Sequence, residues 1–184
     1  MNGRVLIIAG SDSGGGAGIQ ADIKTVTALG GFAMTAITAL TAQNTTGVQG
    51  IHEVPADFVS QQMHSVIDDL GVDAIKIGML HRPEIIEVVA NVLIDKLPGV
   101  PVILDPVMIA TSGARLIEDS AAEALSERLL PHADLLTPNA PEAAALSGQL
   151  VETIGCFDCR TEHAGYGPRS YSYEGWSSWR RHGH

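Results

Sequence analysis

Long apolar runs are missing from this chain of 184 residues. No stretch of about 18 uninterrupted apolar residues occurs, and a membrane-spanning helix needs roughly that length. The residues from Met1 to Arg4 lead directly into a short apolar segment, without the longer apolar core of a secretory signal peptide. We therefore expect a cytoplasmic protein that has no membrane partner.

Positive charge is also scarce. The chain has 11 Lys and Arg residues against 21 Asp and Glu residues, for a formal net charge of -10, and the basic residues are scattered. Proteins that bind nucleic acids gather basic side chains into patches that face the phosphates. The charge balance therefore predicts no nucleic-acid partner, although an acidic protein can still bind a phosphate locally.

Aliphatic side chains stop abruptly after Gly155. The residues that follow contain no Ile, Leu, Val, Met or Lys, yet they hold both Cys, both Trp and all three Tyr of the chain. Such a segment cannot supply the apolar faces of strands and helices. We expect residues 1–155 to form the N-terminal part of one domain and residues 156–184 to be an aberrant, disordered tail.

Two nucleotide-binding motifs are absent from the glycine-rich turn at residues 14–16. No Gly-Lys-Ser/Thr ends this turn, as a P-loop requires, and its glycine spacing differs from G-x-G-x-x-G. The turn nevertheless joins an apolar segment to a helix that Gly18 opens, and the free N–H groups of a helix start favour a polar or anionic group. We interpret it as a ligand-binding turn. The alternative is a tight strand-to-helix connection that binds nothing.

Strand-like and helix-like segments alternate along the chain before the break at Gly155. This pattern predicts an α/β fold with a mainly parallel central sheet and helices on both faces. The expected strands are residues 4–9, 34–41, 48–54, 74–77, 102–104 and 134–136; the expected helices are 18–29, 55–70, 83–97, 120–130 and one that residues 137–142 open. Ligands bind beyond the carboxyl ends of such strands. The candidate binding residues that follow the predicted strands are Asp12, Gln43 (in a loop), Met79, Asp105 and Asn139.

Four residues near these strand ends have the chemistry to hold a flat polar ring. The amide of Gln43 offers a donor and an acceptor to a heterocycle, and Asp22 could accept a hydrogen bond from a ligand hydroxyl or amine. Met79 and Val107 could sandwich an apolar ring face. Each has a plainer alternative: a solvated loop glutamine, a carboxylate favoured by a helix N-terminus, and two ordinary core side chains.

Asn139 and Glu142 lie three residues apart at a predicted helix start. An amide and a carboxylate on one side of a helix can orient water around Mg²⁺, which prefers oxygen ligands. The alternative is a helix cap in which Glu142 simply completes a capping box.

Five sequence blocks together resemble a known family. They are Ser11–Lys24, Thr41–Thr45, Ile75–Met79, Leu104–Met108 with Thr111–Gly113, and Leu136–Glu142. In this order they resemble hydroxymethylpyrimidine/phosphomethylpyrimidine kinase of thiamine biosynthesis, in the ribokinase-like superfamily, over about residues 3–155. The resemblance implies a ribokinase-like fold that is incomplete at its C-terminus. It also implies ATP-dependent phosphorylation of 4-amino-5-hydroxymethyl-2-methylpyrimidine and then of its monophosphate.

The resemblance also implies roles for particular residues. The residues that would bind the aminopyrimidine are Gly10, Asp22, Gln43, Met79 and Val107. Asn139 and Glu142 would organise the phosphates of ATP, and Asp105 with Glu142 would bind Mg²⁺. The family further implies a homodimer, and it implies that the glycine turn serves the pyrimidine and not the nucleotide.

The phosphate-handling motifs of this family are absent from the chain. Family members carry a later Lys-Gly-Gly-His strand and a Gly-Thr-Gly-Cys turn, which supply an anion hole and the catalytic base, and neither occurs here. We therefore assign no catalytic residue. A pyridoxal kinase-like enzyme and a non-catalytic pyrimidine-binding fragment stay open as alternatives.

The tail after Gly155 has a specific explanation. When Tyr173–His182 is back-translated and read one base later, it permits Lys-Gly-Gly-His-Leu-Gly-Gly-Asp, which resembles the missing strand. We hypothesise a frameshift near codon 156, so that Cys156 and Cys159 are out-of-frame residues and form no zinc or redox site. Resequencing of this region tests the hypothesis, and a restored frame without the missing motifs would contradict it.

Overall fold

The fold was analysed in a computed structural model, which describes residues 2–108, 117, 119–147 and 170–171. The elements follow the chain as β1 (Arg4–Asp12), α1 (Gly18–Ala28), β2 (Phe32–Asn44), β3 (Gly47–Glu53), α2 (Ala56–Leu70), β4 (Ala74–Ile77), α3 (Pro83–Lys96), β5 (Val102–Leu104), α4 (Asp119–Arg128), the 3-10 turn η1 (Leu130–His132), β6 (Leu135–Leu136), α5 (Ala140–Ser147) and β7 (Ser170–Tyr171).

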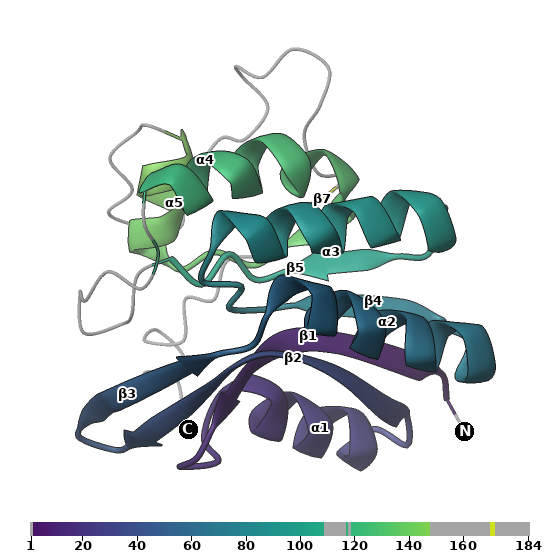
Figure 1. The fold of residues 1–184 in the computed structure, drawn as a ribbon, viewed down its shortest axis with the longest axis horizontal. Coiled ribbons are helices and arrows are strands. Elements are labelled where there is room, and N and C mark those ends of the chain that lie inside the picture. Colours follow the sequence, from purple (N-terminus) through teal and green to yellow (C-terminus); the bar gives the residue numbers. More distant parts are fainter. Residues whose placement is uncertain (1, 109–116, 118, 148–169, 172–184) are drawn as a thin grey trace, which may run out of the picture.

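The strands form one mixed, mainly parallel sheet. Its order is β3-β2-β1-β4-β5-β6-β7 (Figure 1). Only the β2–β3 pair among these is antiparallel, whereas β1 pairs in parallel with both β2 and β4, and the later strands continue in parallel. The predicted α/β class and the mainly parallel sheet are thus confirmed. Parallel strands end at the same edge of the sheet, which brings the segments after β1, β4 and β5 together.

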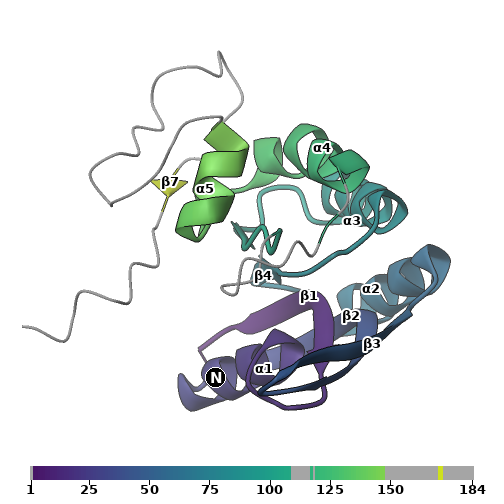
Figure 2. The same ribbon diagram turned by 90° about the vertical axis from the view of Figure 1, so that its left-hand side faces the viewer.

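Helices cover both faces of the sheet, as the apolar patterns predict. Leu6 and Ile8 of β1 join the larger core, which α2, α3 and α4 complete on one face. Ile7 and Ala9 alternate with them and pack against Ile19 of α1 on the other face. Figure 2 shows α1 on its own side of the sheet. The alternation within one buried strand reflects the period of two that puts successive side chains on opposite faces.

The β2–β3 hairpin differs from the prediction. Gln43 was expected in a loop, but it lies within β2 and pairs with Val48 of β3. Strand β1 likewise runs three residues past Ala9, because the backbone beyond a bulge continues to pair with β2. Every residue of β3 is exposed. An edge strand without a buried face shows no apolar alternation, so its pairing cannot be read from the local pattern.

Helix ends follow the expected signals with one exception. Pro83 occupies the first turn of α3, where its missing N–H costs nothing. Gly71 ends α2 with φ of 70°. Helix α4 ends at Arg128, two residues before the expected Leu130, and the chain turns into η1 instead. Pro131 explains this difference because it has no backbone N–H with which to continue the hydrogen bonds of the α-helix.

The predicted boundary at residue 155 lies outside the described residues, as do Cys156, Cys159 and nearly all of the predicted tail. Within that tail, β7 pairs in parallel with β6. The division into two segments and the frameshift therefore stay predictions. In the part of the chain that the structure describes, no helix combines the length and the apolar character that a membrane crossing requires.

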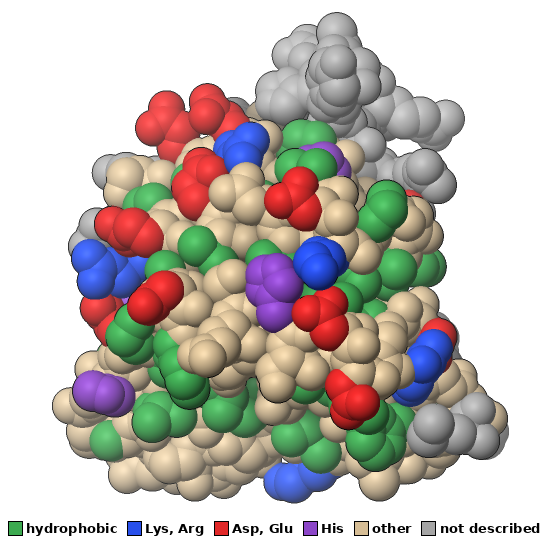
Figure 3. All heavy atoms as spheres, turned by 45° about the vertical axis from the view of Figure 1, so that its right-hand side comes forward, with side chains coloured by type: hydrophobic (Ala, Val, Ile, Leu, Met, Phe, Trp, Pro, Cys, Tyr) green, Lys and Arg blue, Asp and Glu red, His purple; other side chains and the backbone are tan. Residues whose placement is uncertain are grey.

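Charged side chains of opposite sign are interspersed on the surface. On the face drawn in Figure 3, basic side chains lie apart from one another among acidic ones. The ion pairs include Arg4 with Asp73, Lys96 with Asp68 and Arg128 with Glu87. Positive charge that is neutralised in this way offers little attraction to phosphates. That the protein has no nucleic-acid partner remains a prediction.

Candidate functional site

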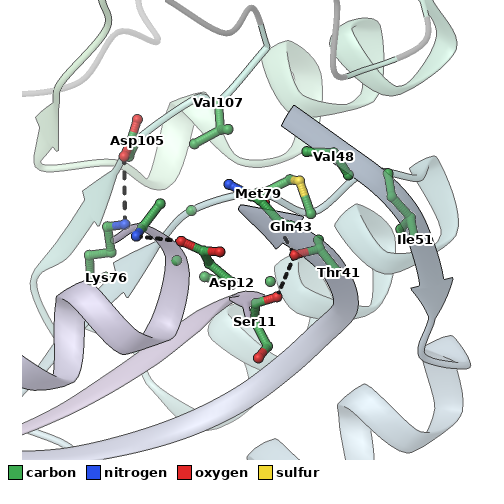
Figure 4. A pocket seen from close by; sticks show the side chains of 15 residues that line it. Ser11, Asp12, Thr41, Gln43, Val48, Ile51, Lys76, Met79, Asp105 and Val107 are labelled. Atoms are coloured by element: carbon green, nitrogen blue, oxygen red, sulfur yellow. Dashed lines mark hydrogen bonds and ion pairs between the residues drawn. The ribbon is translucent and has the colours of Figure 1, made fainter. Parts of the chain in front are cut away.

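A cavity of about 290 Å³ lies where the carboxyl ends of β1, β4 and β5 meet (Figure 4). This volume is at the lower end of the range for small-molecule sites, which suits a ligand of one ring. Its walls come from the end of β1 and the glycine turn, from the β2–β3 hairpin, and from the segments after β4 and β5. Apolar and polar side chains both contribute to the lining.

The cavity brings together most of the residues predicted at the strand ends. Gly10, Gln43, Met79, Asp105 and Val107 all line it. These five residues are far apart in the sequence, and the parallel sheet gathers them because their strands end at one edge. Asp22 is not among the lining residues. Its carboxylate pairs instead with Lys76, which does line the cavity, at 3.0 Å between Oδ2 and Nζ.

The glycine turn is organised by a carboxylate of the chain itself. The backbone N–H of Gly14 donates to Oδ1 of Asp12, and those of Gly16 and Ala17 donate to Oδ2, at 2.7–2.9 Å. Asp12 is only 6% exposed. Asp12 thus uses three N–H groups of the glycine turn that would otherwise be available to an anionic ligand. These bonds hold the turn in place as a wall of the cavity.

The environment of Asp12 keeps its carboxylate charged. Burial raises the pKa of this carboxyl. The hydrogen bonds from the backbone N–H groups of Gly14, Ala17 and Gly16 together lower the pKa by more than burial raises it, so that it lies below the ordinary value. Hydrogen bonds to the ionised form have this effect because they are lost on protonation. A negative charge is therefore a fixed part of this wall of the cavity.

Gly10 allows Met79 to reach into the cavity. A Cβ atom on Gly10 would lie 2.7 Å from Cε of Met79. The backbone of Met79 is anchored separately, because the hydroxyl of buried Thr38 donates to its carbonyl oxygen at 2.7 Å. The turn after β4 is thus fixed while the thioether tip lies over a glycine. A flexible, polarisable side chain in this position can adapt to the face of a ring.

Two neighbours hold Gln43 in place. The hydroxyl of Thr41 lies 3.2 Å from Oε1 of Gln43 and 3.0 Å from the carbonyl oxygen of Ser11 (Figure 4). The backbone N–H of Gln43 donates to the hydroxyl of Ser13, which in turn donates to the Gln43 carbonyl oxygen, both at 2.8 Å. These bonds connect the hairpin to the glycine turn and orient the amide of Gln43 at the cavity.

Sequence reasoning missed several lining residues. Val48 and Ile51 lie on β3 and cover one side of the cavity, although they are 46% and 42% exposed. Two apolar residues in a short segment after Gln43 were the available signal. Lys76 was also missed. A charged residue between Ile75 and Ile77 in a buried strand departs from the apolar pattern, and such departures are common at functional sites.

Asn139 and Glu142 form a capping box at the start of α5. The backbone N–H of Glu142 donates to Oδ1 of Asn139, and the backbone N–H of Asn139 donates to Oε2 of Glu142, both at 2.9 Å. The second oxygen of Glu142 accepts a bond from the backbone N–H of Met108 at 2.9 Å. The structure therefore contains the helix cap that was the alternative interpretation of these two residues. This cap ties α5 to the segment that carries Val107, and a metal role for these residues stays a prediction.

The described residues contain no group of three or more His, Cys, Asp or Glu side chains that could hold a metal ion. Asp105 and Glu142 are the acidic residues predicted for Mg²⁺. Asp105 lies 3.5 Å from Nζ of Lys76, and Glu142 is 3% exposed. Two carboxylates do not fill the coordination shell of Mg²⁺, so a metal held by them would need oxygen ligands from a nucleotide or water as well.

A family model matches most of this chain. The family model described as phosphomethylpyrimidine kinase matches residues 12–163. A hydroxymethylpyrimidine/phosphomethylpyrimidine kinase from Haemophilus influenzae is 56% identical over 145 residues, which are 79% of this chain and 54% of that protein. The chain thus spans about half the length of the curated relatives of this kind that it matches.

Solved structures give the same picture of the fold. The crystal structure of a phosphomethylpyrimidine kinase from Clostridium difficile 630 superposes with a TM-score of 0.78 at 43% identity, over 83% of this chain and 65% of that one. An ADP complex of pyridoxal kinase from Bacillus subtilis gives a TM-score of 0.72 at 38% identity, over 83% and 57% of the two chains. Each likeness covers 83% of this chain.

Proposed function

Because this chain belongs to the phosphomethylpyrimidine kinase family, we propose that its cavity binds 4-amino-5-hydroxymethyl-2-methylpyrimidine and that the protein serves its ATP-dependent phosphorylation in thiamine biosynthesis. The observation that carries this proposal is the convergence of Gly10, Gln43, Met79 and Val107 on one small cavity. A flat ring with polar edges needs apolar contacts on its faces and a donor-acceptor pair at its edge. These four residues supply both.

Each contact has a defined task in this proposal. The amide of Gln43, oriented by Thr41, pairs with the nitrogen and amino edge of the pyrimidine. Met79 and Val107 contact the ring, and Gly10 leaves room for the thioether. Asp22 accepts a hydrogen bond from the hydroxyl or amine of the ligand at the edge of the cavity. The fixed hydrogen bonds around Gln43 reduce the entropy that binding would otherwise lose.

The phosphate donor in this proposal is ATP, with Mg²⁺ as its metal ion. Asp105 and Glu142 would hold the ion, because carboxylate oxygens are the donors that Mg²⁺ prefers. The bound ion would neutralise charge on the transferred phosphoryl group. Asn139 would keep Glu142 in place through the capping box. No catalytic base is assigned, since the chain has no Gly-Thr-Gly-Cys sequence.

A second candidate ligand is pyridoxal, which the likeness to a pyridoxal kinase favours. Its ring offers no aminopyrimidine edge to Gln43, so the two ligands are distinguished at this residue. Calorimetric titration of the 184-residue chain with each ring, followed by an assay of ADP formation with Mg·ATP, tests the proposal. Tighter binding of the aminopyrimidine supports it, and preferential binding of pyridoxal would contradict it. Binding without ADP formation identifies a non-catalytic binding protein.

Gln43→Leu is expected to weaken binding of the aminopyrimidine at least tenfold. The substitution removes the donor-acceptor pair while keeping the volume similar, and hydrogen bonds of this kind contribute about 1–1.5 kcal/mol each. Calorimetry measures the loss. Gln49→Leu is the matched control, because Gln49 lies on the same hairpin, contacts Asn44 and Gly47, and does not line the cavity. Equal affinities of the two variants would count against the role of Gln43.

The family also suggests a homodimer, and the predicted cytoplasmic location belongs to the same proposal. Sedimentation equilibrium of the purified chain tests the dimer.

A further inference from the structure

Lys76 is a charged residue at the centre of the sheet. It lies on β4, which is the fourth of seven strands in the sheet order. Its cross-strand neighbours are Ile7 on one side and Ile103 on the other. Ile75 and Ile77 point to the opposite face and are fully buried. An ammonium group in such a setting is costly unless it is paired, so a lysine here needs compensation from nearby charges.

Two carboxylates from different elements provide this compensation. Nζ of Lys76 lies 3.0 Å from Oδ2 of Asp22, on α1, and 3.5 Å from Oδ2 of Asp105, which follows β5. Figure 4 shows the Lys76 side chain directed towards Asp105 at the cavity. Lys76 and Asp105 line the cavity, whereas Asp22 lies just outside the lining. The lysine is thus the physical link between Asp22 and the space that a ligand would fill.

The geometry favours a fixed arrangement of this charged cluster. The three side chains are only 20–34% exposed, so solvent screens their attraction less than it would at an open surface. An ammonium group has three donors and can serve two carboxylates at once. Without it, the carboxylates of Asp22 and Asp105 would lie near each other with no ammonium group between them.

We propose that Lys76 is a positioning residue: it holds the carboxylate of Asp22 in the orientation that receives the aminopyrimidine, and it joins this carboxylate to Asp105 in the lining of the cavity. The inference rests on the proposed function, since it concerns the same ligand. Lys76 acts through Asp22 in this account. Its loss therefore changes the affinity for the ring and does not merely reduce the amount of folded protein.

Calorimetric titration of 4-amino-5-hydroxymethyl-2-methylpyrimidine onto the full chain tests this proposal with a set of variants. Lys76→Met is expected to bind about tenfold more weakly than the wild type, while Lys76→Arg recovers most of the loss because its guanidinium can donate to both carboxylates. The double variant Lys76→Met/Asp22→Asn is expected to bind no more weakly than the weaker of its two single variants. Lys96→Met is the matched control, because it removes a surface pair with Asp68 and neither of these residues lines the cavity.

The outcomes separate this proposal from the proposed function. If the wild type does not bind the ring, the proposed function fails and the inference with it. If the wild type binds and Lys76→Met binds equally well, the inference alone is overturned. A double variant whose fold-loss of affinity equals the product of the two single fold-losses would also overturn the inference, because Lys76 would then act independently of Asp22. Should Lys76→Met fail to fold in a thermal unfolding control, Lys76→Gln replaces it with the same expected loss.

Discussion

Gly18→Ala is expected to lower the free energy of unfolding by about 3 kcal/mol or more and to abolish ring binding. Gly18 has φ of 54°, and a Cβ atom there would lie 2.3 Å from the carbonyl oxygen of Gly10. The positive φ of Gly18 and the close approach of the Gly10 carbonyl oxygen therefore each disfavour a side chain at this position. The carbonyl belongs to β1 and cannot move without breaking the pairing of Ser11 with Gly18.

Two other glycines of the same turn are controls for this prediction. Gly15 has φ of 76° but only Nζ of Lys24 near its Cβ position, at 3.5 Å, so Gly15→Ala tests the backbone strain alone. We expect it to cost about 1 kcal/mol. Gly16 has neither constraint, and Gly16→Ala is expected to be close to neutral. Urea unfolding followed by circular dichroism measures all three. A Gly18→Ala midpoint equal to that of Gly16→Ala would refute the close approach.

Asp12→Asn is expected to lower the free energy of unfolding by about 2–4 kcal/mol at neutral pH. Asp12 uses both oxygens to accept three backbone N–H groups. An asparagine has one acceptor oxygen, so at least one N–H group would face an NH₂ group, and an unsatisfied buried donor costs about 1–3 kcal/mol. The lost negative charge adds to this cost. Asp95→Asn, an exposed residue on α3, is the control and is expected to have little effect.

The effect of Asp12→Asn should depend on pH. The folded pKa of Asp12 lies below its ordinary value, so its stabilisation is fully present above the unfolded pKa of about 3.9 and is lost as the pH falls through the lower folded pKa. The difference between wild type and variant should therefore shrink below about pH 4. Other carboxylates, including Asp73, whose pKa the hydrogen bond from Arg4 lowers to about 2, are the same in both proteins and cancel. A difference that grows on acidification would contradict this reasoning.

Local sequence patterns were sufficient for most of the fold. β4 and β5 occupy the predicted residues, and α1, α2 and α3 begin and end within about one residue of the expected limits, because apolar periodicity and Gly or Pro signals act within a few residues. The β2–β3 hairpin was predicted less well. Gln43 lies in a strand because β3 pairs with it, and the local pattern around an exposed edge strand does not show how far this pairing extends.

The site could be predicted only in part for a similar reason. Met79, Asp105 and Val107 follow strands and Gly10 lies near the end of β1, and a parallel sheet brings such positions to one edge. The pairing of Asp22 with Lys76 depends on the distance between α1 and β4, which no sequence spacing contains. The role of Asp12 in the glycine turn could not be predicted from the sequence either, since the three N–H groups reach its carboxylate only when the turn has folded back on the strand.

The most direct test of the proposed pocket is a ¹³C-methyl methionine NMR spectrum of the chain, titrated with 4-amino-5-hydroxymethyl-2-methylpyrimidine. Met79 lines the cavity, whereas Met34 and Met63 are buried in the main core at 4% and 0% exposure. A ring stacked on the thioether should shift the Met79 methyl signal in a saturable manner and leave those of Met34 and Met63 unchanged. Assignment follows from single Met→Leu variants. A titration in which the Met79 signal stays in place, while the chain is folded, would contradict the assignment of this cavity to the aminopyrimidine.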